Sequence, residues 1–416
     1  MALFKPFKAV RPIPEKAAAI ASLPYDVMDS DEARIEVQKH PLSFIHVEKP
    51  EVDLPLGTDL YAPEVYAKAR VNLYAYLEKG LMHQDDRPAF YIYKQTMDGR
   101  VQIGLVGLAS IDDYLENRIK KHEHTRADKE ADRIRHVDIC NAHSSPVFFT
   151  YRHHKSIDGI VSQVMQSTQP VYDFVSDDGI GHALWVMDKP QDTGAITRAF
   201  AELSCLYVAD GHHRTASAVR VGQMRREQCP NFRGDEEFNY IMTVIFPDNQ
   251  LKIFDYNRIV KDLHGHNQEK FLQLVADKFI IEPVSRTTIY HPEQSHTFSM
   301  YLNGMWYKLT AKADTWNQDN MVDSLDVSIL QNNLLAPILG IHDPRKEKRI
   351  DFVGGIRGLG ELQKRVDSGK EVVAFALYPT SMDELIGIAD AGLIMPPKST
   401  WFEPKLRSGL FIHLLS

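Results

Sequence analysis

One short stretch constrains this chain more than any other: an apolar run that stops at an Asp-Gly pair and continues as a helical pattern. Residues 206–209 are apolar and include a tyrosine and a valine, which is typical of a buried strand. Asp210 and Gly211 form a turn dipeptide, and small residues with helical spacing begin at Thr215. This order predicts a strand, a tight turn and a helix.

The predicted helix start suits a bound anion, above all phosphate. The first backbone N–H groups of a helix have no acceptor inside it and carry the positive end of its dipole. Gly211 allows a ligand close to the backbone, and Arg214 offers a planar fork of donors. His212 and His213 can add hydrogen bonds or charge, and Asp210 could hold a Mg²⁺ ion that bridges phosphates. The alternative is a solvated surface turn.

The composition is that of a globular chain with an acidic balance. Its 416 residues suffice for two or three domains of the usual size. With 48 basic and 56 acidic side chains the net charge is −8, which disfavours binding of nucleic acid. The few cysteines (Cys140, Cys205 and Cys229) have no metal-ligand spacing, so we expect a reducing compartment, the cytoplasm. The sequence has neither a signal peptide pattern nor an apolar run of about 20 residues, so we expect no membrane association.

Turn dipeptides and periodicity predict further elements of the fold. Hairpins are expected around Asp98-Gly99, Asn303-Gly304 and Asp248-Asn249, the last joining strands at 240–246 and 251–257. Amphipathic spacing predicts helices at 63–79 and 324–339, and a short strand is expected at 43–47.

Two early acids stand beside a predicted helix at residues 29–39. Asp26 follows Pro24-Tyr25 in a predicted loop, where functional groups are common. Glu32 lies in the first turn of the helix, so a carboxylate that stabilises the helix dipole is the alternative to a catalytic role.

Two further stretches are dense in charged and hydroxyl side chains. Residues 119–135 place Lys129 and Arg133 on one predicted helix face, and a solvated charged face is the alternative to a binding role. The segment Lys398-Ser399-Thr400, with Lys405 beyond it, interleaves hydroxyls and lysines as a phosphate clamp would. A surface loop is the alternative there, and a segment that packs back over the first domain could close a site.

The chain resembles a bacterial family known as domain of unknown function 1015. Within it, the run from Asp210 to Arg214 is similar to the Asp-Gly-His-His-Arg signature of the ParB/sulfiredoxin-like fold, as found in free-serine kinases. The blocks that carry the resemblance are Leu23 to Val27 with Glu32 to Arg34, Ile119 to Arg126 with Lys129-Glu130 and Asp132-Arg133, Asp210 to Arg214, Phe352 to Gly355, and Met395 to Phe402.

The resemblance implies a mixed α/β (α+β) fold. We expect a ParB/sulfiredoxin-like nucleotide-binding core at residues 1–260, with an insertion at about 80–200. A C-terminal α/β domain is expected at 261–416, contributing the segment Lys398 to Thr400. The predicted boundary lies near Val260.

For function, the resemblance implies a small-molecule kinase that phosphorylates free L-serine with ATP or ADP and Mg²⁺. Asp26 or Glu32 is the expected base, and Glu123 could hold Mg²⁺ or act as a base. The phosphate-binding candidates are Asp210, Gly211, His212, His213, Arg214, Lys120, Lys121, His122, Arg126, Lys129, Arg133, Lys398, Ser399, Thr400 and Lys405.

Other classes of protein remain as alternatives. A ParB-like nucleotide switch would use the same turn but needs a basic DNA-binding face, and a non-catalytic ligand sensor is compatible with every motif. A sulfiredoxin-like reductase needs a cysteine where His212 stands, so it is set aside. Zinc on His122 and Glu123 would need two adjacent ligands, which is poor spacing. The sequence leaves the oligomeric state open, a homo-oligomer included.

Overall fold

A computed structural model describes residues 2–416, apart from the side chain of Ser285. The described chain divides into two compact units: residues 2–121, 125–251 and 404–416 form the first, and residues 122–124 and 252–403 form the second. Helices and sheets occur in both, and the sheets include parallel and antiparallel pairs, so the predicted mixed α/β class is confirmed. The predicted boundary near Val260 lies at the end of β14 (Tyr256–Val260), inside the second unit.

A large mixed sheet forms the centre of the first unit. Its order is β6-β11-β8-β12-β5-β4-β10-β9, and β1 pairs with β5. β6 is parallel to β11 and β8 is parallel to β12, whereas β5 is antiparallel to both β4 and β12. The strands are β1 (Phe4–Lys5), β4 (Phe90–Met97), β5 (Arg100–Ser110), β6 (Ile119–Lys120), β8 (Val147–Tyr151), β9 (Tyr172–Val175), β10 (Gly181–Met187), β11 (Leu206–Asp210) and β12 (Tyr240–Pro247).

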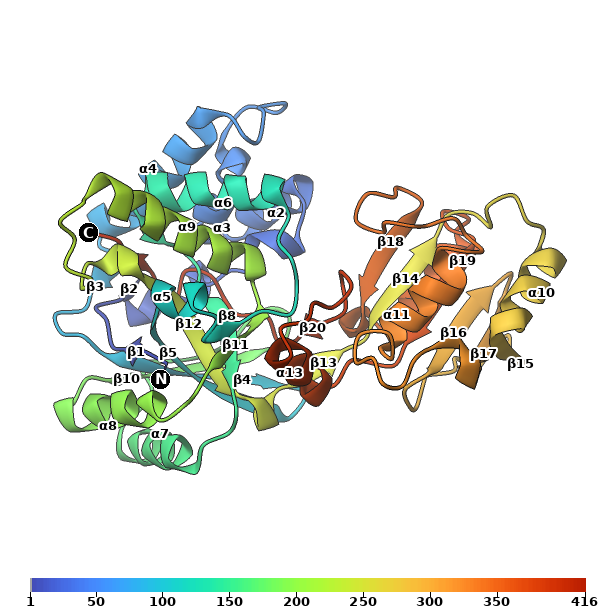
Figure 1. Ribbon diagram of the computed structural model, residues 1–416. Coiled ribbons are helices and arrows are strands. Elements are labelled where there is room, and N and C mark those ends of the chain that lie inside the picture. The colour runs from blue at the N-terminus through green and yellow to red at the C-terminus, as the bar shows by residue number, and fades with distance from the viewer. Residues whose placement is uncertain (1) are drawn as a thin grey trace. The chain divides into compact units, whose positions relative to one another are not determined.

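Helices cover both faces of this sheet (Figure 1). One face carries α4 (Pro63–Glu78), α6 (Ala127–Cys140) and α9 (His212–Gln228), and the opposite face carries α7 (Lys155–Ser167) and α8 (Pro190–Ala201). Shorter helices of this unit are α1 (Ala17–Ile20), α2 (Ser30–Lys39), α3 (Ile45–Glu48) and α5 (Ile111–Leu115).

Two short strand pairs tie distant segments of the first unit together. β2 (Val10–Pro12) pairs with β3 (Met82–Gln84), and β21 (His413–Leu414) pairs with β7 (Ala142–His143). Residues 404–416 therefore return to the first unit after the second unit is complete.

Aromatic side chains fill the core between the sheet and α8. Phe4 stacks on Phe90, with ring centroids 5.0 Å apart, and contacts Phe200 of α8 at 4.5 Å. All five residues of β8 are buried, as expected for a central strand covered on both faces. Leu206 and Val208 of β11 are buried in this core, and the end of β11 sets the position from which α9 begins.

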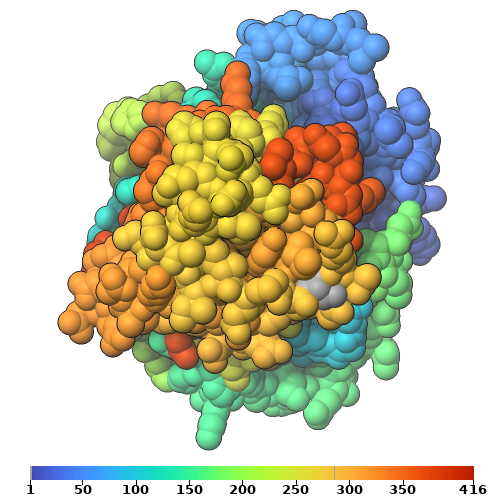
Figure 2. Space-filling view, turned by 90° about the vertical axis from the view of Figure 1, so that its right-hand side faces the viewer, coloured from blue at the N-terminus to red at the C-terminus, as the bar shows by residue number. Residues whose placement is uncertain are grey.

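The second unit contains an antiparallel sheet of order β15-β17-β16-β19-β14-β18. Its edge strand β15 exposes about half of Ile280, and the surface around β15 and α10 faces the viewer in Figure 2. Pro283 in that edge lacks a backbone donor, which discourages pairing with another chain. The elements are β13 (Ile253–Phe254), β15 (Phe279–Ser285), β16 (Thr297–Leu302), β17 (Met305–Ala311), β18 (Ile350–Gly354), β19 (Val373–Leu377), β20 (Trp401–Phe402), α10 (Gln268–Lys278), α11 (Asp326–Leu330), α12 (Leu359–Asp367) and α13 (Met382–Asp390).

Several locally encoded predictions are confirmed. β11 ends at Asp210, and α9 begins directly after Gly211. The hairpins at Asp98-Gly99 and Asn303-Gly304 join β4 to β5 and β16 to β17, with positive φ angles at both turn positions. The helix predicted at 63–79 is α4.

Three predictions are wrong. The strand expected at 43–47 is instead the short helix α3, and the helix expected at 324–339 is interrupted after α11 by a π-helical turn at Gln331–Leu335. The hairpin around Asp248-Asn249 does not form, because β12 pairs with β5 and β8 while β14 pairs with β18 and β19 in the other unit.

Gly222 provides a test of how closely α9 packs. A Cβ atom at this position would lie 2.5 Å from the carbonyl oxygen of Phe238 and 2.7 Å from Cδ1 of Ile111. We expect Gly222→Ala to lower the free energy of unfolding by about 1–3 kcal/mol through overpacking, measured by chemical denaturation. Gly159→Ala is the control, because open space surrounds this helical glycine and a gain of about 0.5–1 kcal/mol is expected. Equal effects in the two variants would contradict the close packing.

Candidate functional site

The junction of β11 and α9 has the geometry that an anion site needs. Gly211 is the N-cap of α9 with φ +86°, a conformation that favours glycine. A Cβ at position 211 would lie 3.4 Å from Nε and 3.6 Å from Nη2 of Arg214. Glycine therefore keeps the space between the turn and the guanidinium clear, at the positive end of the helix dipole.

Arg214 lies on the first turn of α9 with only 13% of its side chain exposed. Its Nη1 donates to the carbonyl oxygen of Pro146 at 2.9 Å, and its Nη2 lies 3.9 Å from Oδ2 of Asp26. Its Nε is buried, with no hydrogen-bond partner among the residues that the structure describes. Burial alone would lower the pKa of Arg214, but Asp26 and Asp210 outweigh it and raise the pKa, so the group stays charged. A buried charge with an unused donor is suited to binding an anion.

Asp210 is already paired. Its Oδ2 accepts from Nζ of Lys405 at 2.8 Å, and its Oδ1 accepts from the backbone N–H of Gly211 at 2.8 Å. Burial would raise the pKa of Asp210, yet Lys405 and Arg214 outweigh it and hold the pKa well below its usual value. Mg²⁺ on Asp210 would have to displace the Lys405 ammonium. In this arrangement Asp210 is therefore not placed as the Mg²⁺ ligand that the sequence predicted.

A small cavity of ≈ 30 Å³ lies beside Arg214, and we call it the Arg214 cavity. Arg133 of α6 also lines it, with its guanidinium 4.2 Å from the centre of the Tyr25 ring and its Nε donating to Asp132 at 2.9 Å. Glu48 is buried and accepts from the Ser144 hydroxyl at 2.6 Å. The residues that line the cavity are Glu48, Arg133, His136, Val137, His143, Ser144, Ser145, Val147, Arg214, Ala218, Ile241 and Met242.

The two early acids lie in different settings. Asp26 approaches Arg214, and 43% of its side chain is exposed, so a ligand can reach it. Glu32 instead closes a capping box at the start of α2: its Oε2 accepts from the Asp29 backbone N–H at 2.9 Å, while Asp29 accepts from the Glu32 N–H. This geometry favours Asp26 over Glu32 as a group that acts at the α9 junction.

The charged block before α6 lies in several settings. Lys120 ends β6 beside β11, and the ammonium of Lys121 lies 4.3 Å from the centre of the Tyr114 ring. The backbone N–H of Arg126 donates to Nε2 of His213 at 3.0 Å, while its guanidinium pairs with Asp128 at 2.8 Å.

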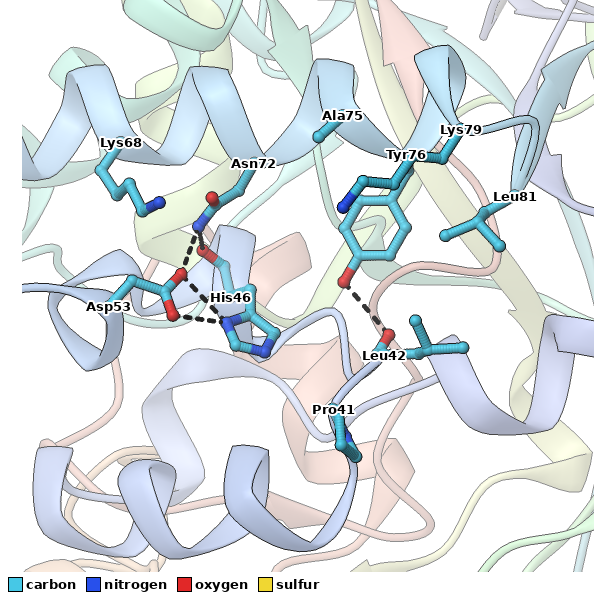
Figure 3. Close-up of a pocket in the computed structure, with 10 residues that line it drawn as sticks. All are labelled: Pro41, Leu42, His46, Asp53, Lys68, Asn72, Ala75, Tyr76, Lys79 and Leu81. Atoms are coloured by element: carbon cyan, nitrogen blue, oxygen red, sulfur yellow. Dashed lines mark hydrogen bonds and ion pairs between the residues drawn. The ribbon is translucent and has the colours of Figure 1, made fainter.

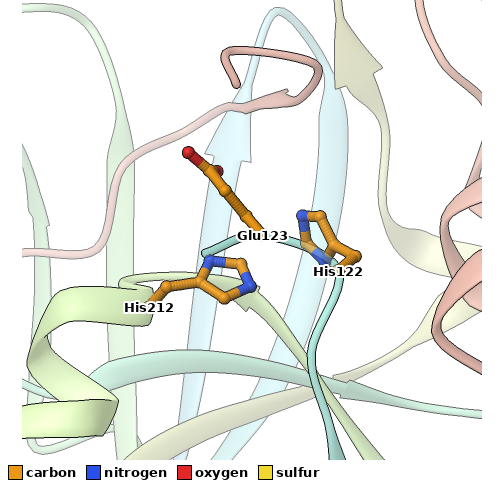
Figure 4. Close-up of side chains that lie close together, drawn as sticks. All are labelled: His122, Glu123 and His212. Atoms are coloured by element: carbon orange, nitrogen blue, oxygen red, sulfur yellow. The ribbon is translucent and has the colours of Figure 1, made fainter. Parts of the chain in front are cut away.

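The remaining members of this block divide between the units. Lys129 is half-buried on α6. His122 and Glu123 belong to residues 122–124, which group with the second unit, whereas His212 is the first residue of α9 (Figure 4). In the second unit, Nε2 of His122 lies 3.3 Å from Oγ1 of Thr400.

The predicted C-terminal clamp also divides between the units. Lys405 belongs to the first unit, where it pairs with Asp210. Lys398, Ser399 and Thr400 belong to the second, where the Ser399 hydroxyl donates to the Pro396 carbonyl at 2.6 Å and Lys398 lies 5.3 Å from the Tyr256 ring centre.

Sequence reasoning missed several groups that line the Arg214 cavity. Glu48 and His143 are buried, as are Ser144 and His136. Glu48 is the last residue of α3, and it was missed because a strand was predicted at 43–47. A signal was available in the run His143-Ser144-Ser145, which places polar side chains directly before the apolar stretch at 146–149.

A larger pocket of ≈ 230 Å³ lies elsewhere in the first unit, between α4 and the segment around α3 (Figure 3). Nδ1 of His46 lies 2.9 Å from Oδ1 of Asp53, and the amide of Asn72 donates to Oδ2 of Asp53 at 2.7 Å. None of the predicted site residues lines it within the described chain. It is therefore separate from the α9 junction.

No helix within residues 2–416 combines the length and the apolar composition that crossing a membrane requires.

The pairing of Asp210 with Lys405 can be tested by titration. A depressed folded-state pKa means that the carboxylate stabilises the fold above its unfolded pKa of about 3.9, and that this contribution is lost as the pH falls through the folded value. We expect Lys405→Met to raise the pKa of Asp210. Carbon NMR of the Asp210 carboxyl group measures this pKa. Lys39→Met is the control, because Lys39 is exposed on α2. An unchanged Asp210 titration in Lys405→Met would show that the ion pair does not form in solution.

Comparisons with known proteins give distant structural matches. SbnI with a C-terminal truncation, from Staphylococcus aureus, is 13% identical with a TM-score of 0.40, covering 74% of this chain and 87% of that one. Free serine kinase in complex with AMP is 11% identical with a TM-score of 0.36, covering 79% and 95%. A conserved hypothetical protein from Pyrococcus furiosus is 11% identical with a TM-score of 0.36, covering 74% and 94%.

No curated protein matches the chain in sequence. A family model described as protein of unknown function (DUF1015) matches residues 4–328, which is most of the chain. The protein therefore belongs to the DUF1015 family.

Proposed function

We propose that this protein is a nucleotide-dependent small-molecule kinase. The donor phosphates, from ATP or ADP, bind at the start of α9, and the acceptor is a small alcohol. The resemblance of the Asp210 to Arg214 run to free-serine kinases makes L-serine the first acceptor to test. Phosphoryl transfer asks a protein mainly for positioning and for neutralisation of charge, so the groups at the α9 junction are the relevant ones.

The observation that carries the proposal is the approach of Asp26 to Arg214. A carboxylate that can accept a hydroxyl proton lies 3.9 Å from a guanidinium that can bind phosphate oxygens. Both are next to a helix N-terminus whose cap is a glycine with positive φ. The hydroxyl of the acceptor and the phosphate of the nucleotide can therefore bind next to each other.

Two cations near the junction can also contact a phosphate group. Lys405 is held at the turn by Asp210, and Arg133 is held beside Tyr25. Each ammonium or guanidinium has further N–H donors, so Lys405 and Arg133 can also donate to a phosphate oxygen while they keep their carboxylate partners, Asp210 and Asp132. Mg²⁺ enters this proposal only as the ion that accompanies the nucleotide in the assay, because Asp210 is engaged by Lys405.

Lys120 lies in β6, which pairs with β11, so it can add positive charge beside the donor phosphates. Roles for Lys121, Arg126 and Lys129 in phosphate binding stay predictions from the sequence. Contributions from Glu123, His122 and the segment Lys398 to Thr400 remain predictions from the resemblance.

Nucleotide binding tests the role of Arg214. We expect Arg214→Ala to weaken ADP binding by about 10- to 100-fold in isothermal titration calorimetry, because charge-assisted hydrogen bonds are lost. Arg220→Ala is the matched control on the same helix, since Arg220 is half-exposed and pairs only with Glu227 in the described structure. Unchanged ADP affinity in Arg214→Ala would overturn the assignment of the phosphate site.

Catalysis tests the two early acids against each other. We expect Asp26→Asn to lower kcat for phosphorylation by about 10²- to 10⁴-fold while ADP binding persists, as the loss of a general base predicts. Glu32→Gln should keep its activity, because glutamine also completes a capping box. The assay supplies Mg²⁺, ATP or ADP, and a panel of small alcohols headed by L-serine. Nucleotide binding without turnover of any alcohol would indicate a ligand sensor instead of a kinase.

A further inference from the structure

A chain of hydrogen bonds runs from the Arg214 cavity to the surface of the first unit. Nδ1 of His143 lies 3.2 Å from Nδ1 of His413, and Nε2 of His413 lies 2.7 Å from Oε2 of Glu237. The two histidines face each other across the paired strands β7 and β21. His143 lines the Arg214 cavity, while Glu237 lines a separate surface pocket.

The chemistry of these groups fixes the direction of the chain. The Glu237 carboxylate only accepts, so Nε2 of His413 carries the hydrogen. In a neutral ring the other nitrogen, Nδ1 of His413, is then the acceptor, and Nδ1 of His143 must donate to it. Nε2 of His143 is therefore left without a hydrogen, as an acceptor.

That acceptor is buried without a partner. Only 5% of His143 is exposed, and its Nε2 has no hydrogen-bond partner among the described residues. An unsatisfied buried acceptor destabilises a fold and calls for an explanation, such as a ligand or an ordered water. The ≈ 30 Å³ of the Arg214 cavity has room for one or two water-sized groups, so a polar group of a ligand fits there but a whole nucleotide does not.

The surroundings keep both rings neutral. Burial lowers the pKa of His143 well below its ordinary value, and the positive charge of Arg225 lowers it further. Burial also lowers the pKa of His413, although Glu237 opposes this shift. Lys5 lies 3.7 Å from Glu237, which keeps the carboxylate ionised. Neutral rings have the fixed donor and acceptor pattern that the chain requires.

We propose that His143 is a ligand-binding residue of the Arg214 cavity, held as a hydrogen-bond acceptor by His413 and Glu237. The ligand is a small acid that also carries a hydroxyl or ammonium group. Its O–H or N–H end enters the cavity and donates to Nε2 of His143, while its anionic group stays at the cavity wall and pairs with Arg133 or Arg214. This inference deepens the proposed function, because it assigns the cavity to the molecule that accepts the phosphoryl group.

The tautomers can be measured in the unchanged protein. Nitrogen NMR of histidine-labelled protein should show Nε2 of His143 bare and Nδ1 protonated, with the reverse pattern in His413. His143→Gln serves only to assign the His143 signals. A hydrogen on Nε2 of His143 in the ligand-free protein would overturn the inference.

A matched pair of probes tests the ligand class. Lactate carries a hydroxyl and propionate does not, so lactate should move the Nε2 signal of His143 and propionate should leave it in place. L-Serine should act like lactate. No response to lactate or to L-serine would refute the inference, even if the protein phosphorylates an alcohol. A response to lactate without any phosphorylation would refute the proposed kinase and leave the binding role of His143 intact.

The surface end of the chain is tested by comparing two acids. Glu237→Leu removes the acceptor that orients His413, so the His143 tautomer should become mixed and lactate binding should weaken by about tenfold, the value of one hydrogen bond. Asp235→Leu changes a neighbouring exposed carboxylate of the same surface pocket and should change neither readout. Equal effects of both variants would show that Glu237 acts only through surface charge and would overturn its positioning role.

Discussion

The burial of one guanidinium governs the arrangement of the first unit's candidate site. A charged group with 13% of its side chain exposed is tolerated only when carbonyl oxygens and carboxylates surround it. Arg214 finds them in Pro146, Asp26 and Asp210, which come from three distant parts of the chain. The fold of the unit thus has to bring the 3₁₀ turn Tyr25–Val27, the loop before β8 and the end of β11 to one point.

The sequence predicts those parts of the fold that depend on interactions between residues close together in the chain. The turn at Gly211 needs a positive φ and the apolar run before it needs burial, so β11 and α9 can be found from a dozen residues. Partners of β12 cannot be found this way. Asp248-Asn249 resembles a hairpin turn, but the chain passes through it into a sheet of the other unit because β5 and β8 already occupy both edges of β12.

The site residues differ in the same way in how far the sequence predicts them. Asp26, Arg214 and Lys405 are charged residues, so the sequence alone marks them as candidates. The structure brings them to one junction. Glu48 and His143 become notable only through burial and through partners 96 and 270 residues away. No local pattern encodes such distances. Cations can also be misjudged from sequence, since Arg126 already has Asp128 as a partner.

The order of segments along the chain has a consequence for synthesis. Lys405, His413 and the strand β21 belong to the first unit, yet the ribosome makes them after all of the second unit. Domains usually fold in order as they emerge, but here the β7 edge and the Asp210 carboxylate must wait for their partners. During translation the first unit therefore lacks Lys405 and β21 until the second unit has been synthesised, so the candidate site can be completed only after that point.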